Sequence, residues 1–446
     1  MSSDRRIAVI GGGITGLAAA HAAIADGAHV VLFEAASKVG GVIRTTPFAG
    51  HPAIDEGADA FLARVPWAVE LARAVSLGDS LTSPAAGRAA VWWNGLHDIP
   101  EGLLLGLPTD VLALAKSPLL SIRGKLRAAT EVLRPRSNTE IDSIGSYVRS
   151  RFGDEVQERL VDPLVGSIYA SDTDDFSLAA VPQLADLAAR SRSVLVTGRR
   201  RPAPPSGPVF YAPTAGMGAL VGAIADHIVR HGGELRCDRT ITELAPDGVQ
   251  WRIDGELFDG VVLACPARAA AALLQGVEPA VASTLAAIPT AGVALLTLAM
   301  PAERWPARLR GLSGYLVPKP QQRLVTAVSF GSQKWAHWAS PDHVVLRVSL
   351  GRDGLPALHL SDSDLLTATR AELHAHLDVD SDPRAVRVSR WPSAFPQYRP
   401  HHGAAIAAAE RLLPRGIALA GASYHGIGIP TCIRSAQQAA KAMTHR

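Results

Sequence analysis

"GGGITG" occupies residues 11–16 and determines which architecture the rest of the chain is expected to adopt. The apolar run Ile7–Ile10 before it is too short for the core of a signal peptide and is typical of a buried strand. A helix of small residues is expected from Leu17 to about Asp26, followed by a second strand over His29–Phe33. This order of strand, glycine turn, helix and strand predicts a βαβ unit.

The glycines of this turn have the G-x-G-x-x-G spacing of a dinucleotide site. Gly11 would make the tight turn, Gly13 would let a pyrophosphate approach the backbone, and Gly16 would allow close contact between helix and strand. Glu34, at the end of the second strand, stands 34 − 16 = 18 residues after Gly16, and its carboxylate suits a ribose diol. We predict a dinucleotide cofactor, with NAD(P) and FAD both open and a plain βαβ unit as the alternative.

A second glycine motif, "KVGGVIRT" at residues 38–45, follows Glu34. Gly40 and Gly41 would bring more backbone toward a diphosphate, and Arg44 would add a cation. The motif resembles the second motif of FAD-dependent amine and porphyrinogen oxidases, which favours FAD over a surface loop. The next stretch contains Asp55 and Glu56, for which a solvated acidic turn is one interpretation.

The stretch "GASYHGIGIP" at residues 421–430 places a glycine-rich turn before a helix expected over Thr431–Ala442. A buried strand expected over Gly416–Ser423 leads into it. If this last strand lies beside the first, the turn stands at the same crevice as "GGGITG", where strand carboxyl ends bind ligands. The helix would then direct its positive end at the flavin pyrophosphate or at the N1/O2 edge of the reduced ring.

The composition excludes several classes of protein. A formal net charge of +3, with no basic tract except Arg199–Arg201, argues against nucleic-acid binding. The three cysteines lie far apart, so we expect neither a metal site nor a disulfide framework, which suits a reducing cytoplasm. The most apolar stretch, residues 102–120, is interrupted by charges and prolines, so we expect no transmembrane segment. No G-x-S-x-G motif supports a serine hydrolase.

The order of patterns along the 446 residues predicts a mixed α/β (α+β) protein with discontinuous domains. A Rossmann-like FAD-binding domain is expected from residues 1–60, 213–280 and 400–446. An antiparallel-sheet substrate domain is expected from residues 61–95 and 281–399. A helical domain is expected over residues 96–212, with a mobile, Pro- and Arg-rich loop near 198–208.

Several motifs together resemble one family closely, and the resemblance runs essentially from end to end. They are "GGGITGLAAA", "KVGGVIRT", "EGADAFLAR", "GDEVQERLVDPLVGSIYASD", "WPSAFPQYRPHH" and "GASYHGIGIPTCI". The chain resembles the oxygen-dependent porphyrinogen oxidases, and more specifically the coproporphyrinogen III oxidases of Gram-positive-type bacteria. The resemblance implies a p-hydroxybenzoate-hydroxylase-like FAD domain. It also implies a cytoplasmic enzyme of heme biosynthesis that passes its product to a ferrochelatase, with attachment to a membrane surface left open.

The implied reaction removes six electrons from coproporphyrinogen III and converts three O₂ to H₂O₂. Because flavin N5 accepts the hydride, the resemblance implies no catalytic side chain and no metal. Oxidation of protoporphyrinogen IX is the alternative, followed by an amine oxidase or a desaturase. A non-catalytic flavin or tetrapyrrole carrier also remains open.

The resemblance also implies site residues. The implied FAD contacts are Gly11, Gly12, Gly13, Ile14, Thr15, Gly16, Glu34, Ala35, Gly41, Val42, Arg44, Gly57, Ala58, Asp59, Ala60, Ile241, Trp391, Ala422, Ile427, Gly428 and Ile429. Candidate substrate contacts are the rim cations Arg64, Arg399 and His402, which suit propionates, and Tyr398 as a wall. Two positions depart from the family pattern: Thr431 replaces an aspartate, and Val65 replaces a lysine.

Overall fold

The computed structural model describes residues 5–136, 141–199 and 207–445. Internal packing divides the chain into two compact units. Unit 1 comprises residues 1–83, 207–289 and 403–446, and unit 2 comprises residues 84–206 and 290–402. The finer division into FAD-binding, substrate and helical domains stays a prediction.

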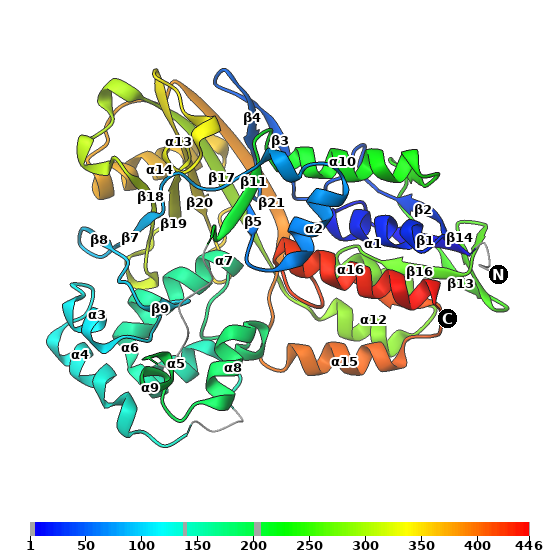
Figure 1. The fold of residues 1–446 in the computed structure, drawn as a ribbon, viewed down its shortest axis with the longest axis horizontal. Coiled ribbons are helices and arrows are strands. Elements are labelled where there is room, and N and C mark those ends of the chain that lie inside the picture. The colour runs from blue at the N-terminus through cyan, green and yellow to red at the C-terminus, as the bar shows by residue number, and fades with distance from the viewer. Residues whose placement is uncertain (1–4, 137–140, 200–206, 446) are drawn as a thin grey trace. The chain divides into compact units, whose positions relative to one another are not determined.

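Unit 1 is built on a five-stranded parallel sheet with the order β12-β2-β1-β16-β22 (Figure 1). Its strands are β1 (Arg6–Ile10), β2 (His29–Phe33), β12 (Glu234–Arg236), β16 (Gly260–Leu263) and β22 (Ile417–Leu419). The expectation that the last strand lies beside the first is wrong, because β16 pairs with both β1 and β22 and separates them. All five strands are parallel, so their carboxyl ends still meet at one edge.

Successive side chains along each strand point to opposite faces of this sheet, and both sets are buried. Helices therefore cover both faces. Val9 faces α1, as its Cγ1 lies 3.3 Å from the position of a Cβ on Gly16, whereas Ala8 and Ile10 join the core cluster on the other face. The first face carries α1 (Ile14–Ala25), α10 (Met217–Arg230) and α16 (Ile429–Thr444). The second carries α11 (Ala267–Leu274), α12 (Pro279–Ala286), α15 (His402–Leu412) and the antiparallel strands β13 (Leu244–Asp247), β14 (Gln250–Ile253) and β15 (Glu256–Phe258).

The expected bounds needed adjustment. Helix α1 starts at Ile14, directly after Gly13 as its N-cap, and α16 extends from Ile429 to Thr444, beyond the expected 431–442. The last strand is shorter than expected, and residues 213–267 form five strands after α10. Unit 1 also contains the hairpin β3 (Thr45–Phe48) and β4 (His51–Asp55), α2 (Pro66–Ala74), η1 (Gly78–Ser80), and a small sheet of β5 (Phe61–Leu62), β11 (Phe210–Pro213) and β6 (Leu81–Thr82).

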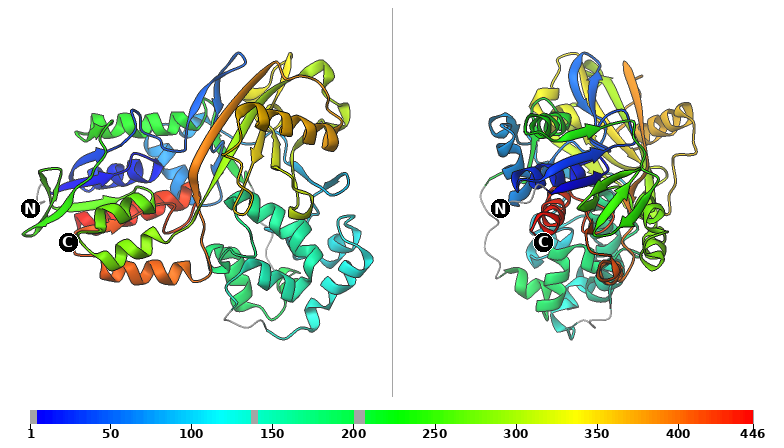
Figure 2. Two further views of the ribbon diagram at one scale, coloured as in Figure 1. Left: turned by 180° about the vertical axis from the view of Figure 1, so that it is seen from behind. Right: turned by 90° about the vertical axis from the view of Figure 1, so that its right-hand side faces the viewer.

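Unit 2 contains a seven-stranded sheet (Figure 2). Its strand order is β21-β17-β20-β19-β18-β7-β8. It comprises β21 (Ala385–Pro396), β17 (Thr290–Pro301), β20 (His343–Leu350), β19 (Val325–Phe330), β18 (Leu312–Leu316), β7 (Arg88–Trp92) and β8 (Leu96–Asp98). Every pairing is antiparallel except that of β18 with β7, which confirms the expected antiparallel strands in residues 281–395. Helix α14 (Asp362–Leu377) packs on one face through Leu365, Leu373 and Leu377.

The rest of unit 2 is mainly helical. It comprises β9 (Leu103–Leu104), β10 (Leu107–Pro108), α3 (Val111–Lys116), α4 (Ile122–Ala129), η2 (Thr130–Leu133), α5 (Ile144–Phe152), α6 (Asp154–Val156), the π-helix η3 (Gln157–Gly166), α7 (Ser167–Tyr169), η4 (Leu178–Ala180), α8 (Pro182–Arg190) and α9 (Val194–Arg199). The loop predicted near 198–208 falls mostly outside the described residues. Within the described part of the chain, no helix has the length and apolarity needed to cross a membrane.

Candidate cofactor and substrate sites

The three glycines of the first loop have different surroundings. A Cβ on Gly11 would stand 2.9 Å from the main chain of Ala264, and one on Gly16 would stand 1.8 Å from the Gly11 carbonyl oxygen. A Cβ on Gly13 would meet nothing within 4 Å. Protein atoms therefore fill the space beside two glycines, and the space over Gly13 is an open cradle of the kind that a pyrophosphate needs.

The second glycine motif packs directly on the first loop. The N–H of Gly40 donates to the Gly12 carbonyl at 2.8 Å, and Gly40 also forms a β-bridge with Gly13. Gly41 has a φ of +58°, which favours glycine, and its Cβ position lies 3.3 Å from the Gly13 Cα. The two motifs thus form one backbone surface, with Val42 beside it and 48% exposed.

Glu34 organises the end of β2. Its Oε2 accepts from the N–H of Gly12 at 2.6 Å, and its Oε1 accepts from the N–H of Ala36 at 2.7 Å. The chain leaving β12 runs alongside, because the N–H of Arg239 donates to the Glu34 carbonyl at 2.9 Å. Ile241, the predicted adenine contact, is 9% exposed and packs in the same core cluster as Phe33. The predicted adenosine residues are therefore drawn from neighbouring segments.

Asp55 and Glu56 are not a solvated turn, since they are only 1% and 7% exposed. Asp55 Oδ1 accepts from the N–H of Met217 at 2.9 Å and from the Thr45 hydroxyl. The Thr45 hydroxyl oxygen accepts in turn from the N–H of Gly218 at 2.7 Å. The side chains of Asp55 and Thr45 therefore cap the N-terminus of α10, where N–H groups lack helical partners.

Glu56 holds a different part of the hairpin. Its Oε1 accepts from the Thr46 hydroxyl at 2.7 Å, and its Oε2 lies 3.6 Å from Arg44 Nη1. The Arg44 side chain remains 59% exposed. Residues 57–60, the predicted ring-edge contacts, are half-buried, and Arg64 beyond them is exposed with no ion pair among the described residues.

The turn "GASYHGIGIP" reaches the first loop even though β22 and β1 are not neighbours. Gly421 has a φ of +109°, its Cβ position lies 2.8 Å from Thr15 Oγ1, and its N–H donates to Ser435 Oγ at 3.0 Å. The contact arises because α16 packs along α1. Ala422 and Ile427, two further predicted contacts, lie half-buried in this turn.

The start of α16 leaves open space. Gly428 is the N-cap, and a Cβ there would meet no atom closer than 3.9 Å. The next residue, Ile429, is 9% exposed. One turn on, burial raises the pKa of the Cys432 thiol to about 11, so this cysteine is a neutral packing residue near neutral pH.

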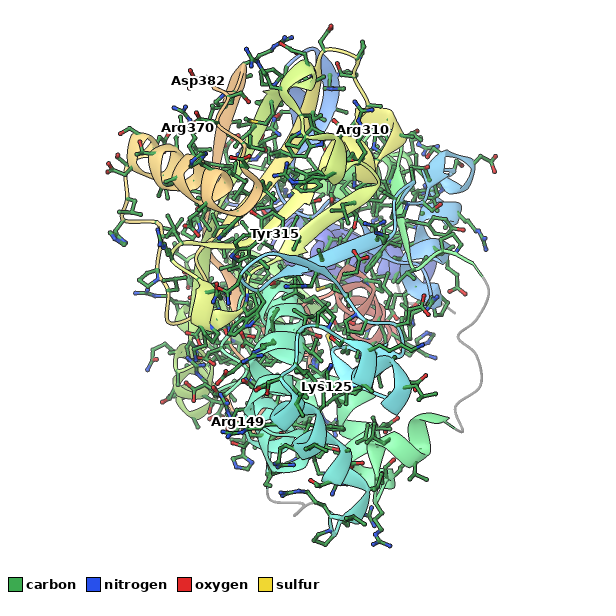
Figure 3. All side chains as sticks on the ribbon, turned by 90° about the vertical axis from the view of Figure 1, so that its left-hand side faces the viewer. Lys125, Arg149, Arg310, Tyr315, Arg370 and Asp382 are labelled. Carbon is green, nitrogen blue, oxygen red and sulfur yellow. The ribbon has the colours of Figure 1, made fainter. Side chains whose placement is uncertain are left out.

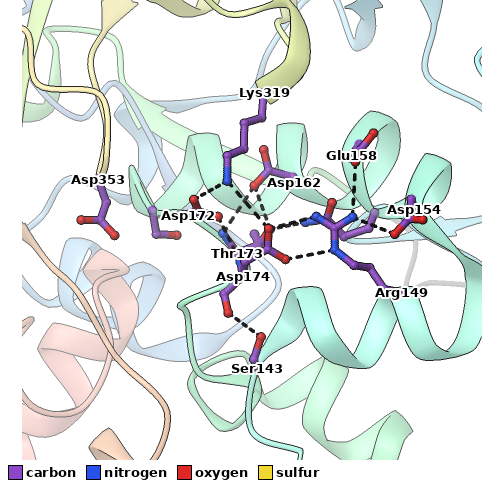
Figure 4. Close-up of polar contacts among 12 residues, drawn as sticks. Ser143, Arg149, Asp154, Glu158, Asp162, Asp172, Thr173, Asp174, Lys319 and Asp353 are labelled. Carbon is purple, nitrogen blue, oxygen red and sulfur yellow. Dashed lines mark hydrogen bonds and ion pairs between the residues drawn. The ribbon is translucent and has the colours of Figure 1, made fainter.

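Unit 2 holds a charged network around the motif "GDEVQERLVDPLVGSIYASD" (Figure 4). Asp162, on η3, forms a bidentate pair with Arg352, with distances of 2.9 Å from Nη1 to Oδ2 and 2.8 Å from Nη2 to Oδ1. Arg352 also donates to the Ser171 carbonyl, and Thr173 Oγ1 donates to Asp162 Oδ1 at 2.7 Å. The Asp162 and Arg352 side chains are 0% and 4% exposed, so each charge depends on the other.

Further pairs extend this network toward the surface (Figure 4). Lys319 pairs with Asp172, and Arg149 Nη2 lies 2.9 Å from Asp174 Oδ2. Burial favours the neutral carboxyl of Asp172, but the hydrogen bond and charge of Lys319 outweigh it and lower the Asp172 pKa. The network therefore alternates acids and bases.

The predicted substrate residues in unit 2 are largely engaged within it. Tyr398 is 3% exposed and lies in a ring stack, with centroids 5.8 Å from Phe176 and 4.0 Å from His402. Arg399 forms a bidentate pair with Asp353, at 2.6 and 3.1 Å. Trp391, the predicted ring neighbour of the flavin, is 7% exposed and packs with Val293 and Ala170.

Sequence reasoning missed two arrangements. It gave the pair Asp162–Arg352 no role, because nothing local links two residues 190 positions apart. It also missed the cap on α10. A signal for that cap was present in the glycine pair Gly216 and Gly218, whose Cβ positions lie 2.5 and 2.9 Å from Thr45 atoms.

Comparison with known proteins shows which family the chain belongs to. The family model described as flavin containing amine oxidoreductase matches residues 14–444. The coproporphyrinogen III oxidase of Bacillus subtilis is 30% identical, with 96% of each chain covered. That of Mycobacterium tuberculosis is 32% identical, with 98% of this chain and 97% of the relative covered. A solved structure of a candidate protoporphyrinogen oxidase from Exiguobacterium sp. 255-15 superposes with a TM-score of 0.87 at 29% identity, covering all of both chains.

The chain therefore belongs to the flavin-containing amine oxidoreductase family. Its mixed α/β architecture is that of flavin oxidases, and its cofactor is FAD. The open backbone surface over Gly13 and the open space at Gly428 fit this group, because FAD needs close approach to backbone N–H groups.

Proposed function

We propose that this member of the flavin-containing amine oxidoreductase family is an FAD-dependent oxidase of heme biosynthesis that converts coproporphyrinogen III to coproporphyrin III. The observation that supports it most strongly is full-length similarity, at 30–32% identity, to relatives named coproporphyrinogen III oxidase. We further propose O₂ as the electron acceptor, H₂O₂ as its product, transfer of the porphyrin to a ferrochelatase and a cytoplasmic location, with attachment to a membrane surface open to test.

FAD, when bound, supplies the hydride acceptor for each oxidation of the macrocycle. The role of the protein itself is to bind FAD and the substrate and to orient them. The backbone around Gly13 and Gly41 holds the pyrophosphate, and Glu34 with Ala35 holds the adenosine ribose. The N-terminus of α16 at Gly428 directs its positive end toward negative charge on the cofactor. No side chain is required as a strong base in this proposal, because loss of hydride from the sp³ bridge is assisted by growing conjugation.

The substrate's propionates call for cations that are not already neutralised. Arg64 is exposed and has no ion pair among the described residues, whereas Arg399 is bound to Asp353 on both nitrogens. We therefore propose Arg64 as the stronger propionate contact, and Arg399 chiefly as a positioning residue for the loop around Asp353. Tyr398 and His402, whose rings stack on each other, would contact the substrate together.

The test compares two substrates on the purified holoenzyme. We expect porphyrin fluorescence and H₂O₂ to appear faster with coproporphyrinogen III than with protoporphyrinogen IX. Arg64→Ala should lower kcat/KM for coproporphyrinogen by about tenfold or more, since a charge-assisted hydrogen bond contributes about 1.5–3 kcal/mol. The loss should be smaller for protoporphyrinogen, which has two propionates in place of four.

Arg73→Ala, another exposed arginine of unit 1, is the matched control and should leave both rates unchanged. Faster turnover of protoporphyrinogen by the wild-type enzyme would assign the alternative substrate. Turnover of amines or phytoene without turnover of porphyrinogens would place the chain with the amine oxidases or desaturases. A yellow protein with no turnover and no H₂O₂ would be a carrier.

A further inference from the structure

One aromatic side chain of the molecule is placed differently from all the others. The chain has 9 phenylalanines, 8 tryptophans and 6 tyrosines, and all of them lie in the described ranges. Phe210, on β11, is the only one of them that is exposed, with 43% of its surface accessible. A phenyl ring left in water forgoes the free energy that burial gives the other rings, so its exposure points to a ligand that covers it.

The ring stands on a short antiparallel ladder in unit 1, formed by β5 and β11 (Figure 1). Phe210 pairs with Leu62, and the N–H of Ala63 donates to the Val209 carbonyl at 2.8 Å. The register therefore holds for one residue beyond the end of β5. Paired residues of an antiparallel ladder project to the same face, so the half-buried Leu62 lies beside Phe210 and extends its apolar surface.

Arg64 supplies a cation at the same end of the ladder. It follows Ala63 directly and stands two residues beyond Leu62, the partner of Phe210. Such a diagonal spacing is within the reach of long side chains. Arg64 is exposed and forms no ion pair with any residue that the structure describes. One end of this ladder therefore offers both an exposed aromatic ring and a guanidinium that no carboxylate neutralises.

The ladder adjoins the candidate cofactor site. Residues 57–60, the predicted ring-edge contacts, lead directly into β5. Helix α16 packs against β5 and against α2, and the guanidinium of Arg434 on α16 lies 5.0 Å from the centroid of the Trp67 ring on α2. The open N-terminus of α16 at Gly428 and the ladder thus belong to one packed part of unit 1.

We propose that Phe210 and Arg64 together bind one pyrrole ring of the porphyrinogen and the propionate attached to that ring. This inference rests on the proposed function and adds a substrate contact from β11, a strand in which the resemblance implies no site residue. The phenyl ring contacts the apolar face of the pyrrole, and the guanidinium pairs with the carboxylate. Because the pyrrole and its propionate are covalently linked, an aromatic side chain next to an unpaired cation matches both groups at once.

Two measurements on the purified holoenzyme test the contact. Fluorescence titration gives the affinity for coproporphyrin III, the stable product, and the rise of porphyrin fluorescence gives the turnover of coproporphyrinogen III. Phe210→Ala should weaken coproporphyrin binding and raise KM about tenfold, with kcat changed by less than about threefold, because the contact is made equally in the ground state and the transition state. Phe210→Tyr keeps the ring and should stay within about twofold of the wild type.

A double-mutant cycle tests whether the two side chains hold the same pyrrole. The losses in coproporphyrin affinity caused by Phe210→Ala and Arg64→Ala should be less than additive, because removing either group releases the pyrrole from the other. Arg310, an exposed arginine of unit 2 (Figure 3), is the matched control for surface charge. Arg310→Ala should leave the affinity unchanged and should be additive with Phe210→Ala. Additive losses from Phe210→Ala and Arg64→Ala would overturn the shared contact.

Val249→Ala is the control for loss of an exposed apolar side chain. Val249 is 96% exposed in the turn between β13 and β14, so this variant should bind and turn over as the wild type does. If the wild type oxidises coproporphyrinogen and Phe210→Ala matches it in both affinity and KM, the inference is overturned and the proposed function stands. An equal loss in Val249→Ala would also overturn it. A wild-type enzyme that does not oxidise coproporphyrinogen would overturn both.

Discussion

The glycine cradle of unit 1 and the charged network of unit 2 solve opposite packing problems. In the cradle, main-chain atoms lie so close together that a side chain has no space at Gly11 or Gly16. In the network, side chains fill the interior, and the buried carboxylate of Asp162 is held by Arg352 and Thr173. The cradle depends on glycines that have no side chain, whereas the network depends on a partner for each buried charge.

This difference determines how each region should fail. A substitution in the cradle acts through steric overlap, so the distance from the new Cβ to its neighbours predicts the damage. A substitution in the network acts through desolvation, since a buried charge that loses its partner is left without compensation.

The largest effect is expected from Gly16→Val. Its Cβ would overlap the Gly11 carbonyl oxygen, a backbone atom that cannot move aside, so we expect a loss of more than about 5 kcal/mol and no bound FAD. Gly13→Val introduces the same side chain where nothing lies within 4 Å, so the unfolding free energy of the FAD-free protein should change by less than about 1 kcal/mol. It should nevertheless abolish FAD retention by filling the cradle.

Chemical unfolding and the ratio of flavin to protein absorbance measure both variants. Full flavin content in Gly13→Val would contradict the assigned pyrophosphate position, and a stable Gly16→Val would contradict the steric argument.

The second effect concerns the buried pair. Asp162→Leu and Arg352→Met should each lower the unfolding free energy by about 3–5 kcal/mol, because each leaves an unpaired buried partner. The double variant should be less destabilised than either single variant, since it buries no charge. A double-mutant cycle by urea unfolding measures this coupling. Additive losses would mean that the two residues act independently.

A middle case is the cap on α10, which combines close packing and polar partners. Thr45→Val keeps the shape of the side chain but removes the hydroxyl that bonds Gly218 and Asp55, so we expect a loss of about 1–2 kcal/mol. Thr284→Val, which removes a hydroxyl bonded within α12, is the control and should cost about 0.5 kcal/mol or less. Equal losses would exclude a special role for the cap.

The smallest effect is a pH dependence in unit 1. The ring centroid of His21 on α1 lies 4.6 Å from that of His227 on α10. The His227 ring stacks on that of His231, with 4.0 Å between their centroids. Burial, and then the neighbouring histidines, lower the pKa of His21, and burial and His231 also lower that of His227. Because the folded state binds these protons less well than the unfolded state, the contribution to stability is full above the ordinary histidine pKa of 6.5.

That contribution should be lost as the pH falls below 6.5 through the lowered values. The shift of the urea midpoint between pH 7.5 and pH 5.5, near the ordinary histidine range, measures it. His21→Asn should reduce the shift, whereas His359→Asn, an exposed histidine of unit 2, should leave it as in the wild type. An unchanged shift in His21→Asn would assign the pH dependence to other groups.

The two regions also differ in how far the sequence predicts them. Spacing alone located Gly11, Gly13 and Gly16, because the conformational demands of a tight turn are local and only glycine meets them. It gave Asp55 and Glu56 the wrong environment, since an acidic pair in a turn looks the same whether it faces water or caps a helix 162 residues away. The motif that contains Asp162 was recognised, but not its partner Arg352.

The βαβ start, the cofactor class and the family follow from short segments whose glycines and apolar runs act locally. Which segments become neighbours follows from the packing of the whole fold. It inserted β16 between β1 and β22, brought Gly421 to Thr15 through the packing of α16 on α1, and joined Asp162 to Arg352. Local patterns restrict the backbone of a few residues, whereas the choice of neighbour depends on which distant surfaces bury apolar area and satisfy buried charge together.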